Sequence, residues 1–454
     1  MRIANPDGKS TYAWGWKVKS VIVAVFCAAA SAALAQVAPD PGLKREIFQI
    51  KAIDDHSHPP RLVAAGETDD EFDALPCDPL EPAPVPAKIR PQNAQFIAAW
   101  KALWKYKYND AAPEHRKELL ATKQRIKREQ GDHYSAWVLD QLGIETELAN
   151  RVAMGRGLVA PRFRWVPFDD ALLFPLDTAA LQTTPDRRFF YGREAQILKR
   201  YMSESQMTGL PATLEQYLAQ LVTPTLERQK NQQAMAVKFE AAYLRPLDFG
   251  AASESDAATV YAHYVRGGAP NATEYKLLQD RIFHHLALEA GRMHLAVHFH
   301  TGAGCGSYFK LSGADPLLLE SAVDDPTLRK TTFVIVHGGW PFTKETAFLF
   351  TKPNVYADYS EQTWLLSPRE LADNLRTWLE WYPERVMFGT DLYPGSAEID
   401  WEEIGWVTTH DARLALTIAL TSMMQDGLIS REGASEIAHM VLHDNAALLY
   451  GLSR

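Results

Sequence analysis

Two histidines one residue apart close the apolar run Leu-Ala-Val-His-Phe-His at residues 295–300. Alternate side chains of an extended strand point to the same side, so His298 and His300 share a face just before Gly302. Imidazole nitrogens arranged in this way are candidate metal ligands. A hydrogen-bonded packing role for the same pair fits this stretch equally well.

Polar residues with metal-binding or acid–base chemistry follow other apolar runs in the same way. The alternating run 47–53 leads into His56 and His58, and later runs lead to Lys238, His337 and Asp391. If these runs are parallel strands of one barrel, their carboxyl-terminal ends open on one face and the side chains converge. Imidazoles and a carboxylate suit a divalent cation such as zinc, which lowers the pKa of water and polarises a substrate oxygen.

Strand-like and helical patterns alternate along the chain. The strand-like runs are 47–53, 144–153, 162–168, 234–240, 294–299, 331–336, 354–357 and 385–389. This alternation predicts an α/β fold, a TIM-type (β/α)8 barrel over residues 36–454. A doubly wound open sheet is the alternative, but no Gly-x-Gly-x-x-Gly motif follows the first strand. The proline- and acid-rich stretch 60–91 and the helical pattern after it predict an insertion at about 60–130, which begins at the active face.

The first 35 residues have the features of a secretory signal peptide. Lys17 and Lys19 precede an apolar run at 21–30, and Ala33-Leu-Ala35 fits cleavage after small residues. A retained amino-terminal anchor is the alternative. The chain after residue 35 has 43 basic and 55 acidic residues, a net charge of −12. This balance argues against nucleic acid or an anionic membrane as partner, and the layout predicts export to the periplasm.

Two cysteines, Cys77 and Cys305, remain after the predicted cleavage. Cys77 lies in the insertion and Cys305 in the turn after the fifth strand, so both loops are expected to leave the same face of the barrel. In an oxidising compartment a disulfide that ties the inserted loop to the loop after His300 is one hypothesis, and two free thiols are the alternative. A cysteine nucleophile is the weaker interpretation, because no Cys-His pattern is local.

Several of these motifs together resemble the amidohydrolase superfamily. They are Ile53-Asp-Asp-His-Ser-His58, Val237-Lys-Phe-Glu240 with Tyr243 and Arg245, Phe299-His-Thr-Gly302, Val336-His-Gly-Gly-Trp-Pro341 and Phe388-Gly-Thr-Asp-Leu392. The nearest resemblance is to the amidohydrolase-related branch (amidohydrolase 2), including barrel domains fused to glutamine-synthetase-like domains. The resemblance extends over residues 290–395 and is recognisable at 46–60 and 234–250.

The resemblance implies roles for individual residues. The metal ligands would be His56, His58, His300 and Asp391, with Asp391 also the general base. His337 would bind a second metal or orient the substrate, and one ion, zinc, is favoured over two. Lys238 would meet a substrate carboxylate; a carbamylated lysine bridging two metals is the alternative. His298 has no role in the family pattern and is either a partner of a ligand or a packed residue.

Three functions follow as hypotheses. The first is a metal-dependent hydrolase, in which water deprotonated by Asp391 attacks a carbonyl carbon of a C–N or C–O bond in a small-molecule substrate. The second is a non-oxidative decarboxylase of an aromatic or enoic acid, and the third is a non-catalytic metal- or solute-binding barrel. Arg245 could bind a substrate carboxylate, or it could form an ion pair at the surface. Trp340 could line an apolar pocket, or it could pack in the core. The sequence leaves the oligomeric state open, a homo-oligomer included.

Overall fold

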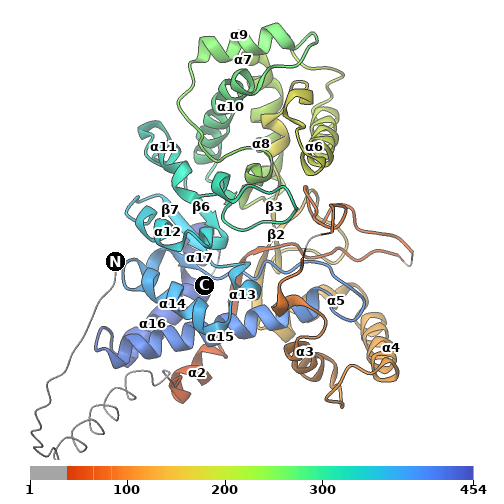
Figure 1. Cartoon of the computed structure of the whole chain (residues 1–454), viewed down its shortest axis with the longest axis vertical. Coiled ribbons are helices and arrows are strands. Elements are labelled where there is room, and N and C mark those ends of the chain that lie inside the picture. The colour runs from red at the N-terminus through yellow and green to blue at the C-terminus, as the bar shows by residue number, and fades with distance from the viewer. Residues whose placement is uncertain (1–37, 65, 83, 453–454) are drawn as a thin grey trace, which may run out of the picture. The chain divides into compact units, whose positions relative to one another are not determined.

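The computed structural model describes residues 38–64, 66–82 and 84–452 (Figure 1). The predicted signal peptide, residues 1–35, lies outside the described residues. Contacts divide the chain into two units, Met1–Ala38 and Pro39–Arg454, and the fold below is that of the second unit. No helix among the described residues is long and apolar enough to cross a membrane.

Eight short strands overlap the eight runs identified in the sequence. They are β1 (Ala52–Ser57), β2 (Ile144–Asn150), β3 (Phe163–Val166), β4 (Ala236–Phe239), β5 (Ala296–His300), β6 (Phe333–Val336), β7 (Val355–Asp358) and β8 (Val386–Met387). The first prediction, 47–53, began too early. Residues Pro41–Ile47 form helix α2, since Pro41 occupies its first turn and the Asp40 side chain accepts a hydrogen bond from the amide of Leu43.

All paired strands are parallel, in two sheets of order β1-β2-β3 and β4-β5-β6-β7-β8. Backbone contacts connect the two sheets at both edges. Phe168, which follows β3, pairs with Lys238 of β4, and at the other edge the amide of Asp55 donates to the carbonyl oxygen of Phe388 over 2.9 Å. The eight strands therefore follow one another around a ring, and the predicted (β/α)8 fold class is confirmed.

The helices surround this ring. They are α3 (Ala94–Trp104), α4 (Pro113–Gln130), α5 (Tyr134–Leu142), α6 (Pro185–Glu204), α7 (Leu214–Tyr217), α8 (Thr223–Asn231), α9 (Glu254–Tyr264), α10 (Ala272–Arg292), α11 (Glu320–Val323), α12 (Thr343–Leu349), α13 (Gln362–Leu365), α14 (Pro368–Leu379), α15 (Trp401–Gln425), α16 (Arg431–His439) and α17 (Asn445–Tyr450). Apolar side chains of the strands, such as Ile53, Leu148 and Val334, form one buried cluster with Tyr450 of α17. A second, larger core lies between strands and helices.

Several contacts hold the segment after β1 to the barrel. Asp69 accepts two hydrogen bonds, both 2.9 Å, from the fully buried guanidinium of Arg151, which follows β2. Lys123 of α4 pairs over 2.8 Å with Glu403 at the start of α15. The disulfide that the sequence left open is present between Cys77 and Cys305, whose Cα atoms are 6.0 Å apart. The loop is therefore covalently tied to the loop that follows β5.

Candidate metal centre

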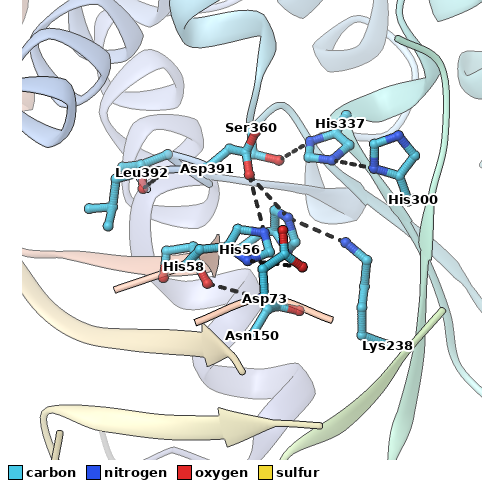
Figure 2. Close-up of polar contacts among 12 residues, drawn as sticks. His56, His58, Asp73, Asn150, Lys238, His300, His337, Ser360, Asp391 and Leu392 are labelled. Carbon is cyan, nitrogen blue, oxygen red and sulfur yellow. Dashed lines mark hydrogen bonds and ion pairs between the residues drawn. The ribbon is translucent and has the colours of Figure 1, made fainter. Parts of the chain in front are cut away.

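The polar residues identified in the sequence lie at the carboxyl-terminal ends of the strands. His56 lies in β1 and His58 follows it, His300 is the last residue of β5, and His337 begins the turn after β6. Asp391 follows β8, with a left-handed backbone (φ 54°) and an amide that donates to the carbonyl oxygen of His56 over 2.8 Å. The backbone hydrogen bond between the segment after β8 and β1 thus positions the aspartate beside the first histidine (Figure 2).

The Asp391 carboxylate lies between the two histidines of the first strand. Its Oδ1 atom is 3.3 Å from Nε2 of His56 and 3.6 Å from Nε2 of His58. Asp391, His56 and His337 can each direct one ligand atom to a common point, with all three atoms within 4.8 Å of one another. The structure therefore brings His337 closer to the potential metal position than the sequence interpretation assumed.

His300 and His337 are joined through their rings. Nε2 of His337 lies 3.0 Å from Nδ1 of His300, and Nδ1 of His337 lies 2.8 Å from the hydroxyl oxygen of Ser360 (Figure 2). Nε2 of His300 is buried and has no hydrogen-bond partner among the described residues. This nitrogen is available for a ligand that the protein itself does not supply.

Lys238 approaches the same group from β4. Its side chain is fully buried, and its Nζ atom lies 3.4 Å from Nε2 of His56 (Figure 2). The ammonium group is thus within reach of an anionic group bound beside the histidines.

Burial determines the charge of the site. It lowers the pKa values of His56, His300 and His337 well below the usual range, with the positive charge of Lys238 contributing to each. These imidazoles are therefore neutral, the form that binds a metal. Burial, followed by the charge of Glu361, raises the pKa of Asp391 well above its usual value.

Three residues discussed in the sequence interpretation have protein partners of their own. The guanidinium of Arg245 contacts Asp280 at 2.8 Å and Gln279 at 3.0 Å, both on α10. Trp340 is partly buried against the hydrophobic core. Nε2 of His298 lies 2.8 Å from the hydroxyl oxygen of Tyr450, so this histidine packs inside the barrel and not at the metal position.

Four polar residues near the site were missed in the sequence. Asp73, in the loop after β1, has an oxygen 4.0 Å from Nδ1 of His58. Asp358, Ser360 and Glu361 lie at or after the end of β7, and one Asp358 oxygen accepts a hydrogen bond from the amide of His337 over 3.2 Å. The strand-end rule that identified the histidines would have found the β7 residues. No local signal identifies Asp73.

The donor set fits a divalent metal ion. Neutral imidazoles and a carboxylate converge in a buried place, as a cation of intermediate softness requires. Nδ1 of His56 and Nε2 of His300 are buried without partners among the described residues, and a bound cation would stabilise the ionised form of Asp391. The residues present are therefore compatible with the metal that the sequence suggested.

Solved structures with a similar fold include three that align along most of their length. A Lactobacillus casei protein described as a metal-dependent hydrolase has a TM-score of 0.57 at 15% identity, covering 90% of this chain and 97% of its own. Glucuronate isomerase from Caulobacter crescentus has a TM-score of 0.54 at 12% identity, covering 91% and 94%. Uronate isomerase from Thermotoga maritima has a TM-score of 0.52 at 12% identity, covering 91% and 98%. At these identities the likeness shows the fold alone.

In sequence, no curated protein matches the chain. The amidohydrolase family model matches residues 213–452, more than half of the 454 residues, and the match includes β4 to β8 with Lys238, His300, His337 and Asp391. The chain therefore belongs to the amidohydrolase family.

Proposed function

We propose that this protein is a metal-dependent hydrolase that cleaves a C–N or C–O bond at a carbonyl carbon of a small molecule, with Asp391 as the general base. The observation that carries the proposal is the position of the Asp391 carboxylate, 3.3 Å from His56 and 3.6 Å from His58. A carboxylate beside a cluster of neutral histidines can accept a proton from a water molecule held there. Membership of the amidohydrolase family supports the same reaction class.

His56, His58, His300 and Asp391 would hold the ion, for which zinc is our choice because imidazole nitrogens dominate the donor set. When bound, the ion would polarise the substrate carbonyl and lower the pKa of a water molecule. His337 would orient the carbonyl oxygen. Its ring is fixed by the 2.8 Å contact with Ser360 and the 3.0 Å contact with His300.

Lys238 would bind an anionic group of the substrate. It is fully buried, and its Nζ atom is 3.4 Å from His56, so a substrate carboxylate at this place would also lie close to the reacting carbonyl. A carbamylated Lys238 bridging two ions is the competing arrangement. Metal analysis separates the two: one ion per chain supports the substrate-binding role, and two ions per chain support the bridge.

The test combines metal analysis with an activity screen of the purified, metal-loaded protein. Panels of amides, lactones and aromatic acids should show metal-dependent hydrolysis of at least one amide or ester. Release of carbon dioxide from an aromatic acid, without hydrolysis of any amide or ester, would favour the decarboxylase instead. Metal binding without turnover of any panel would favour the non-catalytic barrel.

We also propose export to the periplasm. The disulfide between Cys77 and Cys305 supports this location, because structural disulfides persist in oxidising compartments. Fractionation of the producing cells should find the protein in the periplasmic fraction, shortened at its amino terminus. Full-length protein in the cytoplasm would contradict the proposal.

A further inference from the structure

Glu361 shares a rare backbone feature with two residues of the metal centre. Among the residues that the structure describes, the non-glycine residues with positive φ angles fall into two groups. Four of them, Lys105, Gln206, Gln233 and His294, lie just after helices. The other three are His337, Glu361 and Asp391, which follow β6, β7 and β8. Left-handed non-glycine residues that do not end helices concentrate at functional sites, because the surroundings must hold them there.

The Glu361 side chain is buried and lacks a protein partner. Only 6% of the residue is exposed, and its Oε2 atom has no hydrogen-bond partner among the described residues. A buried carboxyl oxygen without a partner costs free energy unless something else binds it. A bound substrate would provide that partner.

The charge of Glu361 acts on residues that belong to the site. Burial is the main cause that raises the pKa values of Asp391 and Tyr243, and the negative charge of an ionised Glu361 raises both further. The ring centroid of Tyr243 lies 4.7 Å from that of His300. Burial raises the pKa of Glu361 itself to about 8, with Lys238 lowering it and Asp358 raising it. At neutral pH Glu361 is therefore largely protonated, and its carboxyl group has a proton to donate.

We propose that Glu361 is a further catalytic residue, whose carboxyl group contacts the leaving group of the substrate and protonates it. The inference rests on the proposed hydrolase function and extends it. The water oxygen bonds to the carbonyl carbon while Asp391 takes one of its protons. The C–N or C–O bond then breaks, and the leaving atom takes the Glu361 proton with the electron pair of the broken bond. Proton transfer from Asp391 to Glu361 through solvent restores both groups.

The test is Glu361→Gln, which keeps the size of the side chain and removes the transferable proton. We would assay p-nitrophenyl acetate, whose phenolate leaves without protonation, and p-nitroacetanilide, whose amide nitrogen requires it. The variant should retain the metal content of the wild type and hydrolyse the ester within about threefold, but lose about 100-fold or more on the anilide. An equal loss on both probes, an unchanged anilide rate or loss of the metal would overturn the proposal.

The matched control is Glu194→Gln. Glu194 is also a buried glutamate, 1% exposed, and both its carboxylate oxygens lack partners among the described residues, but it lies in the regular helix α6. This substitution should leave both rates and the ratio between them as in the wild type. A selective loss on the anilide in this variant as well would show that any buried glutamate affects the leaving group, and would overturn the assignment to Glu361.

Infrared difference spectra provide a readout that does not depend on turnover. The wild type minus Glu361→Gln spectrum at pH 7 should contain the carbonyl band of a protonated carboxylic acid. The band of an ionised carboxylate in its place would overturn the proton-donor role even if the enzyme is active. Absence of turnover by the wild type on every panel would instead count against the hydrolase function, so the two failures are distinguishable.

Discussion

Asp391 and His56 contact each other twice, although 335 positions separate them in the sequence. The amide of Asp391 donates to the carbonyl oxygen of His56 over 2.8 Å, and the Asp391 carboxylate lies 3.3 Å from the His56 imidazole. The backbone contact joins the segment after β8 to β1, and the side-chain contact forms the centre of the candidate site. Closure of the barrel and assembly of the metal centre are therefore one structural event.

The first prediction concerns the general base. Asp391→Asn should lower turnover by about 10²-fold to 10⁴-fold, because the amide cannot accept the proton of water. The melting temperature of the metal-free protein should not fall, since burial already raises the pKa of this carboxyl group and a neutral amide suits the place. Steady-state kinetics and calorimetry measure both quantities.

Asp324→Asn is the control for this substitution. Asp324 is 2.8 Å from Lys352, and the two residues precede β6 and β7, whereas the candidate site lies at the carboxyl-terminal ends of the strands. The loss of this surface ion pair should leave turnover unchanged. Wild-type turnover in Asp391→Asn would exclude the general-base role.

The second prediction separates the two histidines of β5. His300→Gln should reduce the metal content of the purified protein, because the substitution removes the Nε2 atom of His300. This buried nitrogen has no partner among the described residues and would bind the ion. His298→Gln should keep the metal content but lower the free energy of unfolding by about 1–3 kcal/mol, since its hydrogen bond with Tyr450 is broken. Metal analysis and urea denaturation of both variants are the measurements. Equal metal loss in the two variants would show that any disturbance of β5 lowers the metal content, and would contradict the role of His300 as a ligand.

The third prediction concerns the disulfide. The denatured, unreduced chain from residue 36 onward should show no reactive thiol, and two after reduction. Cys77→Ser should lower the free energy of unfolding by about 2–5 kcal/mol, because the bond links positions 228 residues apart. Reduction of the wild type should produce the same loss. Two thiols before reduction would show that the bond does not form.

The fourth prediction is a pH dependence of stability. Burial raises the pKa of Asp169 to about 7, and its hydrogen bond with Gln229 opposes the shift. Because the pKa is higher in the folded protein than in the unfolded chain, about 3.9, the stabilising contribution is full below about pH 4 and is lost as the pH rises through 7. Asp169→Asn should remove this loss, which amounts to roughly 1–4 kcal/mol between pH 4 and 8.

Urea denaturation of Asp169→Asn and the wild type at several pH values measures this difference. Asp140→Asn is the control, because Asp140 is largely exposed and pairs with Arg162 on the surface. Parallel pH profiles for Asp169→Asn and the wild type would contradict the prediction.

Much of the fold was predictable because each strand carries a local pattern. Short apolar runs that end in a polar residue or glycine mark strands of a parallel barrel, whose buried faces leave few polar positions except at the ends. His56, His58, His300, His337 and Asp391 were found by this rule. The start of β1 was misjudged because Ile47, the last residue of α2, and Ile50, in the turn after it, are buried just as strand residues would be.

Other features depended on contacts between distant segments. The sequence left open whether Arg245 binds substrate or forms an ion pair, and α10 supplies Asp280 and Gln279 as its partners. The role of His298 depended on Tyr450, 152 residues away.

The sequence by itself determined which segments form helices or strands and which chemical groups stand at each strand end. The spacing of apolar residues, the residue types and their positions at the ends of apolar runs are local properties of the chain. Only the tertiary structure decided which polar groups meet: that His337 joins His56 and Asp391, and that Glu361, after β7, is buried with one carboxyl oxygen that has no partner among the described residues. The physical reason is that burial and pairing depend on which segments the closed barrel brings together, and residues far apart in the chain carry no local signal of that contact.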